Sequence, residues 1–591
     1  MAARSWPARG LRWPSAVGLA ICAAAASCAS ARLFPLRAPM ATDTDLRSFS
    51  APCRVEPSKK DPNHLACTPD LYVSPLAWDG SDNSIFRPLA RVFAVDPAGE
   101  APNVNSMDEV PDSAWFTNRI GARPMSLDEV SRGACEPRLI LDDPTEVGVW
   151  VVDQGKMNGS SEGFRVNIPG KGKYLFKSDE GGGVERPTGA SAIGATAYHD
   201  VGFFTSCEQI VYFKPSALKL TPGLRFADNS GIVRDFDQAR LDKVLKGSGR
   251  RGEYIRMQAS AWLPGHLLGP FRYEGTRGDD PNDVIRHEDR RDLRGGRLLA
   301  AWLDHFDARE QNTMDSWISD RGKDDPDASP GYVRHYYLDT SDCIGSEWAW
   351  DAISKRLGYS YLLDYGDIGL DFVTLGIRSP VYDHIERTPG REKFGYFNVR
   401  DFEAERWKNE YPNPAFSRMT ERDGAWMARI LSRFTPEMVS AIAKLGEFSD
   451  PGDTAFVAET LEGRLERILD RYLTRLSPIA DVHIEGNALL CGTDLAERRG
   501  VRDAAAFAYE ARLARGAPLA VTRRSGGEVC VALPRIAGDG GPADESPARY
   551  FGVAIADGVA PGPLVAYLYD RGPARGYALA GIERPSRERS R

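Results

Sequence analysis

The order of hydrophobic patterns along the chain predicts a mixed α+β protein built from more than one domain. Residues 145–245 contain short apolar or alternating runs separated by turn signals, which are typical of strands. Residues 246–478 show mainly the spacing of amphipathic helices, and residues 479–585 return to short strand-like runs. A chain of 591 residues exceeds one core, so we expect a β-rich part, a helical part and a small β-sandwich-like C-terminal domain.

The N-terminus carries the signals of an exported protein. Three arginines precede a short apolar run over residues 16–26, which is too short to span a bilayer. Small residues then lead into Cys28, as in a lipobox whose cysteine is acylated, although the usual leucine three residues earlier is absent. Ordinary cleavage after Ala31 and a retained anchor are the alternatives.

These signals predict an outer-membrane-anchored lipoprotein that faces the periplasm or the cell surface, with residues 1–28 as its signal peptide. Residues 29–60 are polar and contain proline, so we expect a tether, and residues 61–144 predict an irregular segment that packs on the next domain. The net charge of −8 gives no sign of nucleic-acid binding. No later stretch is apolar enough to cross a membrane, so we expect membrane contact only through the N-terminal lipid.

Export implies an oxidising compartment in which cysteines can pair. Cys53 and Cys67 flank one polar loop, and Cys491 and Cys530 lie within one C-terminal segment, so we expect these two disulfides. Three further cysteines remain, which leaves one over: Cys135, Cys207 and Cys343. No Cys or His cluster has the spacing of a zinc site, and the chain has only 8 histidines.

One segment has the spacing of a phosphotransfer catalytic loop. His305, Asp307 and Asn312 fit the pattern H-x-D-x-x-x-x-N, between a predicted amphipathic helix and a predicted strand. In such a loop Asp307 orients the acceptor hydroxyl, and Asn312 turns back to hold Mg²⁺. Arg309 stands where a cation would neutralise the transferred phosphate.

Two more charged residues occupy the places that this chemistry requires. Lys177 ends the second strand of a predicted hairpin and precedes a helix, which is the place of a phosphate-binding lysine. Asp339 follows the strand predicted at 333–338, which is the place of a metal-binding aspartate. Each residue alone is a weak signal, but their order predicts a bilobal kinase-like domain. Its N-lobe would be residues 145–245 and its C-lobe 246–478, with ATP and Mg²⁺ as cofactors.

The sequence also departs from the kinase pattern. Asp339 is followed by Thr-Ser-Asp without the usual glycine, so Asp342 is an alternative metal ligand. The helix after Lys177 carries Ser191 and Ala195 where a glutamate is expected, and Glu185 is the remaining candidate partner for the lysine. The glycine-rich cover over the phosphates is degenerate, with glycines only at 155, 159 and 163.

Several strings resemble a family of uncharacterised exported bacterial proteins, over roughly residues 90–480. These strings lie at 103–105, 112–119, 173–177, 188–190, 279–283, 301–315 and 335–339. The core of that family in turn resembles the lipid-kinase and HipA-type branch of the kinase superfamily. The resemblance implies a kinase-like fold, but a fold alone does not determine an activity.

The sequence therefore predicts an exported ATP- and Mg²⁺-dependent phosphotransferase whose envelope or extracellular acceptor is unknown. Transfer of AMP instead of phosphate is a variant of the same chemistry. One alternative is a pseudokinase, which binds nucleotide with little or no turnover. Another is an envelope scaffold or adhesion lipoprotein that binds through its C-terminal β domain.

Overall fold

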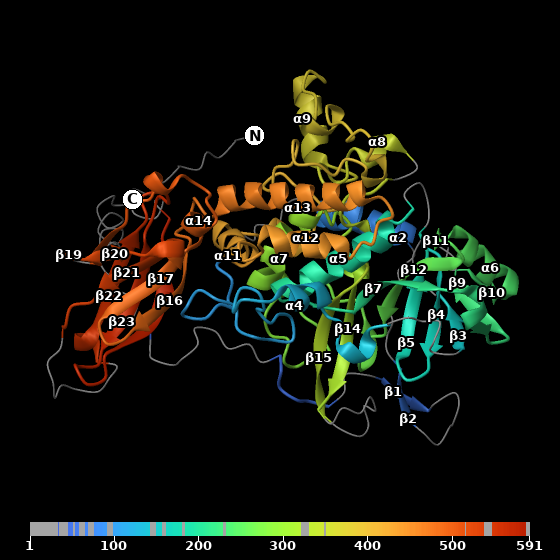
Figure 1. Ribbon diagram of the computed structural model, residues 1–591, viewed down its shortest axis with the longest axis horizontal. Coiled ribbons are helices and arrows are strands. Elements are labelled where there is room, and N and C mark those ends of the chain that lie inside the picture. The colour runs from blue at the N-terminus through green and yellow to red at the C-terminus, as the bar shows by residue number, and fades with distance from the viewer. Residues whose placement is uncertain are drawn as a thin grey trace, which may run out of the picture.

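The computed structural model of the chain has a mixed α+β architecture. Helices occupy the centre, with one group of strands on the right and the C-terminal strands on the left (Figure 1). The structure describes residues 34, 45–50, 76–91, 99–141, 149–156, 161–179, 184–227, 232–320, 330–347, 350–514, 516–536 and 546–586, and the backbone of two strands, β1 (Arg54–Pro57) and β2 (Leu65–Thr68).

A seven-stranded sheet forms the first part of the fold. Its order is β11-β12-β5-β4-β3-β8, and β7 also pairs with β12. The predicted hairpin is β4 and β5, whereas the boundary predicted at residue 245 is wrong because β12 continues this sheet beyond it. The strands are β3 (Trp150–Gly155), β4 (Gly163–Ile168), β5 (Gly172–Lys177), β7 (Glu208–Phe213), β8 (Leu218–Leu220), β11 (Gly249–Arg251) and β12 (Tyr254–Ala261).

Two helices pack on this sheet. Helix α6 (Gln238–Gly247) closes an apolar core that contains Trp150, Phe176 and Phe213. Helix α5 (Arg186–Val201) contacts β7 and β12. The helix begins after Glu185 and not at Thr188 as predicted, because a proline at its second position fixes a helical φ one turn earlier. It ends at Gly202, whose φ of +147° stops the helix as expected.

The middle of the chain is less helical than predicted. Strands β13, β14 and β15 form a four-stranded sheet with β6, and the β14–β15 hairpin directly follows the predicted catalytic loop. These strands are β6 (Phe204–Thr205), β13 (His266–Gly269), β14 (Thr313–Ser319) and β15 (Gly331–Tyr337), and a small hairpin pairs β9 (Leu224–Ala227) with β10 (Val233–Phe236).

The longer helices are α7 (Arg291–Leu303), α9 (Tyr365–Thr374), α11 (Glu421–Leu431), α12 (Pro436–Lys444) and α13 (Pro451–Tyr472). The shorter helices are α2 (Leu76–Ser81), α3 (Arg87–Ala90), α4 (Leu127–Arg132), α8 (Asp351–Ser354), α10 (Pro414–Ser417) and α14 (Leu495–Arg498).

The C-terminal part consists of two antiparallel sheets with a shared apolar core, as expected for a sandwich-like domain. One sheet has the order β16-β17-β21-β20 and the other β19-β18-β22-β23-β24. The strands are β16 (Ile479–Glu485), β17 (Leu489–Asp494), β18 (Glu510–Leu513), β19 (Pro518–Leu519), β20 (Val521–Arg523), β21 (Glu528–Ala532), β22 (Tyr550–Ala556), β23 (Leu564–Asp570) and β24 (Tyr577–Glu583).

The segment before the first sheet packs deeply on the rest of the molecule. The Asp108 carboxylate contacts Arg291 at 2.6 Å, Arg429 at 3.2 Å and Arg584 at 2.5 Å, so it joins α7, α11 and the C-terminal domain. Burial would raise the pKa of Asp108, but these three arginines hold the pKa well below its ordinary value. Trp115 stacks on His335, with ring centroids 3.4 Å apart.

Two parts of the predicted tether at 29–60 dock on the folded protein, so a free linker is the wrong description at these positions. Phe34 is buried on the C-terminal domain, where the hydroxyl of Tyr569 donates to its carbonyl at 2.9 Å. Phe49 pairs its backbone with Gly331 at the tip of the β14–β15 hairpin. Apolar side chains in a polar run therefore dock the chain instead of leaving it as a linker.

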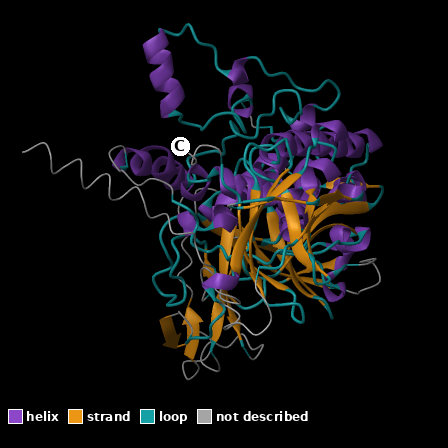
Figure 2. Ribbon diagram, turned by 90° about the vertical axis from the view of Figure 1, so that its left-hand side faces the viewer, coloured by secondary structure: helices purple, strands orange, loops and turns teal. Residues whose placement is uncertain are grey.

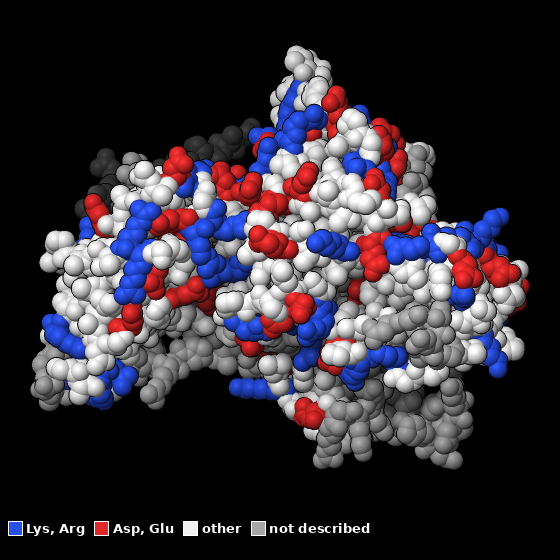
Figure 3. Space-filling view, in the orientation of Figure 1, with Lys and Arg blue, Asp and Glu red and all other residues white. Residues whose placement is uncertain are grey.

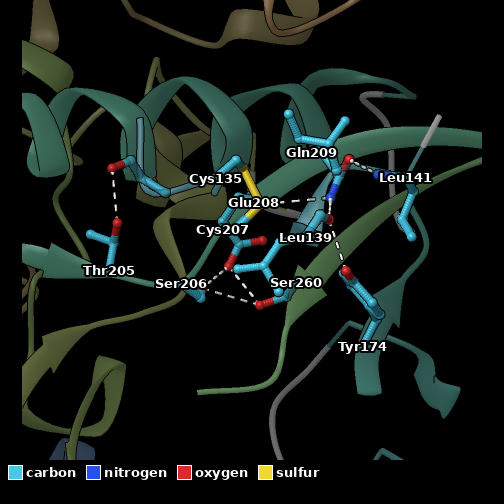
Figure 4. Close-up of a disulfide and its surroundings, with 12 residues drawn as sticks. Cys135, Leu139, Leu141, Tyr174, Thr205, Ser206, Cys207, Glu208, Gln209 and Ser260 are labelled. Carbon is cyan, nitrogen blue, oxygen red and sulfur yellow. Dashed lines mark hydrogen bonds between the residues drawn. A yellow bond between two sulfur atoms is a disulfide. The ribbon is translucent and has the colours of Figure 1, made fainter. Parts of the chain in front are cut away.

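Disulfides hold the first sheet and the C-terminal domain. Cys491 and Cys530 are joined, which is one of the two expected pairs. Cys135 and Cys207 are also joined, beside Gln209 and the backbone of the segment that precedes the sheet (Figure 4). The expected Cys53–Cys67 pair and the predicted lipidation site Cys28 lie outside the described residues, and Cys343 is free and buried.

Within the described ranges, we find no helix that is both long and apolar enough to cross a bilayer.

The Cys135–Cys207 disulfide should contribute to stability, because it closes a loop of 72 residues in the unfolded chain. Replacing both cysteines by alanine should lower the free energy of unfolding by about 2–4 kcal/mol, measured by urea denaturation. Cys343→Ala is the control, since this buried thiol is free and its loss should cost less. An equal loss in the two proteins would contradict this role for the disulfide.

Candidate functional site

The predicted catalytic loop begins where α7 stops. Asp304 adopts a left-handed conformation with φ +57°, which ends the helix and turns the chain toward the interior. The Asp304 carboxylate accepts from the indole of Trp407 at 2.9 Å and contacts Arg464 at 3.3 Å. Because these contacts fix the turn, the loop leaves the helix in one direction.

His305 is fully buried, and its contacts help to hold the loop in place. Its Nδ1 lies 2.9 Å from the hydroxyl of Tyr198 on α5. Burial lowers the pKa of His305 to about 4, and the nearby backbone and carboxylate of Asp339 only partly offset it. The ring is therefore neutral near pH 7 and acts as a fixed contact between α5, the loop and the turn after β15.

Asp307, Arg309 and Asn312 lie together at the centre of the loop. Arg309 Nε lies 2.8 Å from Asp307 Oδ1, and the Asn312 amide donates at 2.8 Å to both Asp307 Oδ2 and its carbonyl oxygen. Burial raises the pKa of Asp307 well above its ordinary value; Arg309 offsets this only in part, and repulsion by Glu410 and Asp342 adds to the rise. Such a carboxylate is suited to accept or share a proton.

Lys177 and Asp339 are brought into direct contact. Lys177 Nζ lies 2.9 Å from Asp339 Oδ1, although the two residues are far apart in sequence. Burial would lower the pKa of Lys177, but Asp339 and Glu208 hold it above its ordinary value. Burial would raise the pKa of Asp339, but Lys177, together with Lys156 and the hydroxyl of Ser341, holds the pKa of this carboxylate well below its usual range.

Backbone and charge interactions connect the Lys177–Asp339 contact to the loop of Asp307 and Asn312. Asp342 follows Asp339 in the turn η7 (Thr340–Asp342), and its charge reaches both Lys177 and Asp307. Asn312 accepts a backbone hydrogen bond from Leu338, one residue before Asp339, at 2.9 Å. The chain therefore leaves the loop through β14 and comes back beside the loop at the end of β15.

Glu185 does not pair with Lys177, which corrects the prediction. Its carboxylate accepts from the backbone and the hydroxyl of Ser449 at 3.0 Å and lies 3.7 Å from Lys393. Glu185 occupies the N-cap position of α5 without capping it through its side chain, and its contacts show that the carboxylate faces the helical part instead of the sheet.

The missing glutamate on α5 has a steric explanation. The hydroxyl of Thr340 donates to the Ser191 carbonyl at 3.0 Å, so the turn η7 lies directly on the helix. A Cβ at Gly194 would stand 2.7 Å from Thr340 and 2.9 Å from Cys343. This helix face must be small, and it cannot carry the long acidic side chain found in the kinase pattern.

Glu208 on β7 is a functional candidate that sequence reasoning missed. Lys177 faces Gln258 across the sheet and Glu208 faces Ser260, and Gln258 and Ser260 are two residues apart on β12. All four side chains therefore share one sheet face. Glu208 accepts from Ser260 at 2.7 Å and from Gln258 at 2.5 Å, and burial raises its pKa despite the attraction of Lys177.

A second missed group surrounds Arg309. Its guanidinium contacts Glu410 at 3.3 Å and the hydroxyl of Tyr411 at 2.5 Å, and Tyr411 donates to Asp79 at 3.3 Å. Asp79 comes from α2, far upstream in the chain. Burial raises the pKa of Asp79, partly offset by Arg309. No short motif links these residues, so only the folded chain reveals them.

The glycine-rich segment supplies one further cation. Lys156 lies between Gly155, which ends β3, and Gly163, which begins β4, and its charge reaches Asp339. Its Nζ donates to the Ser161 carbonyl at 2.8 Å. Gly163 is required by the sheet, since a Cβ there would stand 2.3 Å from the Phe176 carbonyl oxygen, and Gly159 lies outside the described residues.

Among the described residues, one set of three side chains has ligand atoms close enough together to hold a metal ion without help from a substrate. This set is Glu485 with Cys491 and Cys530, whose sulfurs are already joined to each other. Asp339, Asp342 and Asn312 nevertheless offer the carboxylate and amide oxygens that Mg²⁺ prefers, and Mg²⁺ commonly uses one or two carboxylates together with substrate phosphates.

Comparisons of this chain with protein-family models, with curated proteins and with solved structures found no match. The family resemblance noted in the sequence therefore stays an expectation, and the site is interpreted from its own geometry.

The Lys177–Asp339 contact should be visible as an energetic coupling. Lys177→Met and Asp339→Asn should each lower the free energy of unfolding by about 1–3 kcal/mol, because each leaves a partly buried charge without its partner. The double variant should lose less than the sum of the two, as measured by urea denaturation at pH 7. Since Lys177 lowers the pKa of Asp339, this stabilisation is present above about pH 4 and is lost as the pH falls further.

An exposed ion pair provides the matched control. Arg138 and Glu136 lie 2.7 Å apart, with side chains that are 75% and 63% exposed. Their neutral variants should show no measurable coupling. Purely additive losses at residues 177 and 339 would show that the two charges do not depend on each other.

Proposed function

We propose that this chain is an exported kinase-like protein that transfers a phosphoryl group from ATP, with Mg²⁺, to an acceptor outside the cytoplasm. The observation that carries the proposal is the direct contact of Lys177 with Asp339, next to the Asp307–Asn312 pair. Four residues with the roles that phosphoryl transfer requires thus converge from a strand, a loop and a turn. The order of these elements supports a bilobal kinase-like arrangement, in which the first sheet is the N-lobe and α7 to α13 belong to the C-lobe.

The residues present fit the cofactors by their chemistry. Asn312 donates its amide to Asp307, so its carbonyl oxygen is the atom that would hold a metal, together with Asp339. Lys177 would leave Asp339 and bind the phosphates, and Lys156 is a second cation in range. Bound Mg–ATP would supply the phosphoryl group and a metal that stabilises charge on its oxygens.

Asp307 and Arg309 would act on the acceptor hydroxyl and on the group that is transferred to it. Asp307 would take the proton of the attacking hydroxyl, and its raised pKa brings it closer to the range that a general base needs near neutral pH. Arg309 would stabilise the negative charge that grows on the transferred group. Glu410 and Tyr411 hold Arg309 in place, so they are positioning residues.

A nucleotide-binding pseudokinase is the second candidate, and one observation favours it. Arg309 pairs directly with Asp307 at 2.8 Å, so the acceptor carboxylate is already occupied by its own loop. Asp307 is also only 8% exposed. In this case the site would bind Mg–ATP through Lys177 and Asp339 without turnover. Retention of the protein at the outer membrane by a lipid on Cys28 is compatible with both functions.

Asp307→Asn tests the proposed chemistry. The variant should reduce label transfer from γ-labelled ATP to envelope material by about 10²–10⁴-fold, since the proton acceptor is removed, while ATP binding is retained. Asp339→Asn should weaken Mg-dependent ATP binding, and Asp342→Asn should do so only if Asp342 is the metal ligand. Transfer of an α-label instead of a γ-label would identify AMP as the transferred group.

Asp383→Asn is the matched control, because this aspartate is exposed and lies outside the site. It should transfer label like the wild type. Equal transfer by Asp307→Asn and the wild type would contradict the assigned role of Asp307. ATP binding without any transfer by the wild type would favour the pseudokinase, and absence of both would favour an envelope scaffold.

A further inference from the structure

Helix α9 and the turn after it expose an unusual amount of apolar surface. Among the described large hydrophobic side chains, the four most exposed are Phe372 at 82%, Val373 at 77%, Leu375 at 87% and Ile377 at 86%. We call residues 372–377 the α9 tip. An apolar cluster of this kind on a soluble surface marks a contact with something else.

Nothing in the described chain covers this tip. No residue of α9 is buried, and the helix stands away from the body of the molecule in both ribbon views (Figures 1 and 2). Leu375 adopts a left-handed conformation with φ +53°, and Gly376 follows with φ +73°, so the chain reverses at this point. The apolar side chains therefore form a convex end. Such a shape inserts into a deformable apolar layer more readily than it packs against a flat protein surface.

The tip is electrically neutral. The sequence from 372 to 377 contains no charged residue, and Arg378 behind it is paired with Asp367 at 3.4 Å. The extremity of this projection shows few charged atoms, whereas charges of both signs are interspersed over the rest of the visible face (Figure 3). A neutral apolar end is more stable in an apolar medium than in water, and it offers no charge complementarity to an ionic partner or to anionic lipid.

The short N-terminal connection indicates which apolar medium is within reach. Phe34 is held on the C-terminal domain, and Cys28, the predicted lipidation site, is six residues upstream. Six residues span at most about 20 Å, so a lipid on Cys28 would keep the whole molecule beside a bilayer. A surface tethered in this way meets the bilayer at a high effective concentration.

We propose that the α9 tip inserts into the interfacial layer of a lipid bilayer and forms a second membrane contact beside the N-terminal lipid. The tip is far too short to cross the membrane, so it would lie among the headgroups and the upper acyl chains of neutral phospholipid. Two separate contacts would restrict the orientation of the protein on the membrane. This inference does not depend on the phosphotransfer proposal.

A fluorescent probe on the tip tests the contact. The full-length Leu375→Cys protein is labelled with the polarity-sensitive dye NBD and mixed with phosphatidylcholine vesicles. Val284→Cys is the matched control, since Val284 is 63% exposed and lies in the loop before α7 and not on α9, and the buried Cys343 should stay unlabelled. The dye at 375 should shift to the blue and be quenched by brominated acyl chains, at low and at high salt alike, whereas the dye at 284 should not.

A second substitution tests whether the apolar tip itself drives insertion. Adding Phe372→Asp to the labelled protein should reduce the quenched fraction by about tenfold or more, because one aromatic side chain is lost from the buried set and a charge is added. An emission at 375 that stays at its value in water would overturn the proposal. An emission that is already blue-shifted without vesicles and is not quenched by bromine would also overturn it, and would identify a second copy of the chain as the cover.

Discussion

The contact between Lys177 and Asp339 is the constraint on which the interpretation of this fold depends. It joins the end of β5 to the turn after β15, and hence the first sheet to the helical part of the chain. Each charge shifts the pKa of the other in the direction that keeps both ionised. A paired cation and carboxylate in partly buried surroundings are costly to keep in a structure for stability alone, since apolar residues would serve as well. Under the proposed function, a phosphate would replace Asp339 as the partner of Lys177, and the metal would replace Lys177 as the partner of Asp339.

The surroundings of Asp307 support the same interpretation from a different direction. The chain buries this carboxylate beside Glu410 and supplies one arginine, so the pKa of Asp307 remains raised. A protein under selection for stability alone would not gather acidic groups there, and perturbed carboxylates of this kind are concentrated at functional sites. Arg309 is shared between Asp307, Glu410 and Tyr411, so the charge balance of the loop depends on the loop itself and on the segment at 410–411.

Local patterns in the sequence were sufficient to predict the elements that carry the candidate site residues. The hairpin before Lys177, the helix before His305 and the strand before Asp339 all exist, because each has a clear hydrophobic period. Patterns could not reveal partners that meet only after folding. Glu208 is opposite Ser260 through sheet register, and Glu410 reaches Arg309 through tertiary packing. The Cys135–Cys207 pair was missed for the same reason, and the start of α5 was misplaced because a proline preceded the predicted cap. Phe34 shows that one apolar side chain can dock a polar segment.

A nucleotide site at Lys177 and Asp339 requires one property that can be measured without knowing the acceptor, namely Mg²⁺-dependent binding of ATP at a single site. Isothermal titration of the full-length protein with ATP measures it directly, with Mg²⁺ and again with EDTA in its place. We expect one ATP per chain with Mg²⁺, much weaker binding without it, and loss of binding in Lys177→Met. Absence of binding in the presence of Mg²⁺, or binding that is indifferent to Lys177, would contradict a nucleotide site between β5 and the turn after β15.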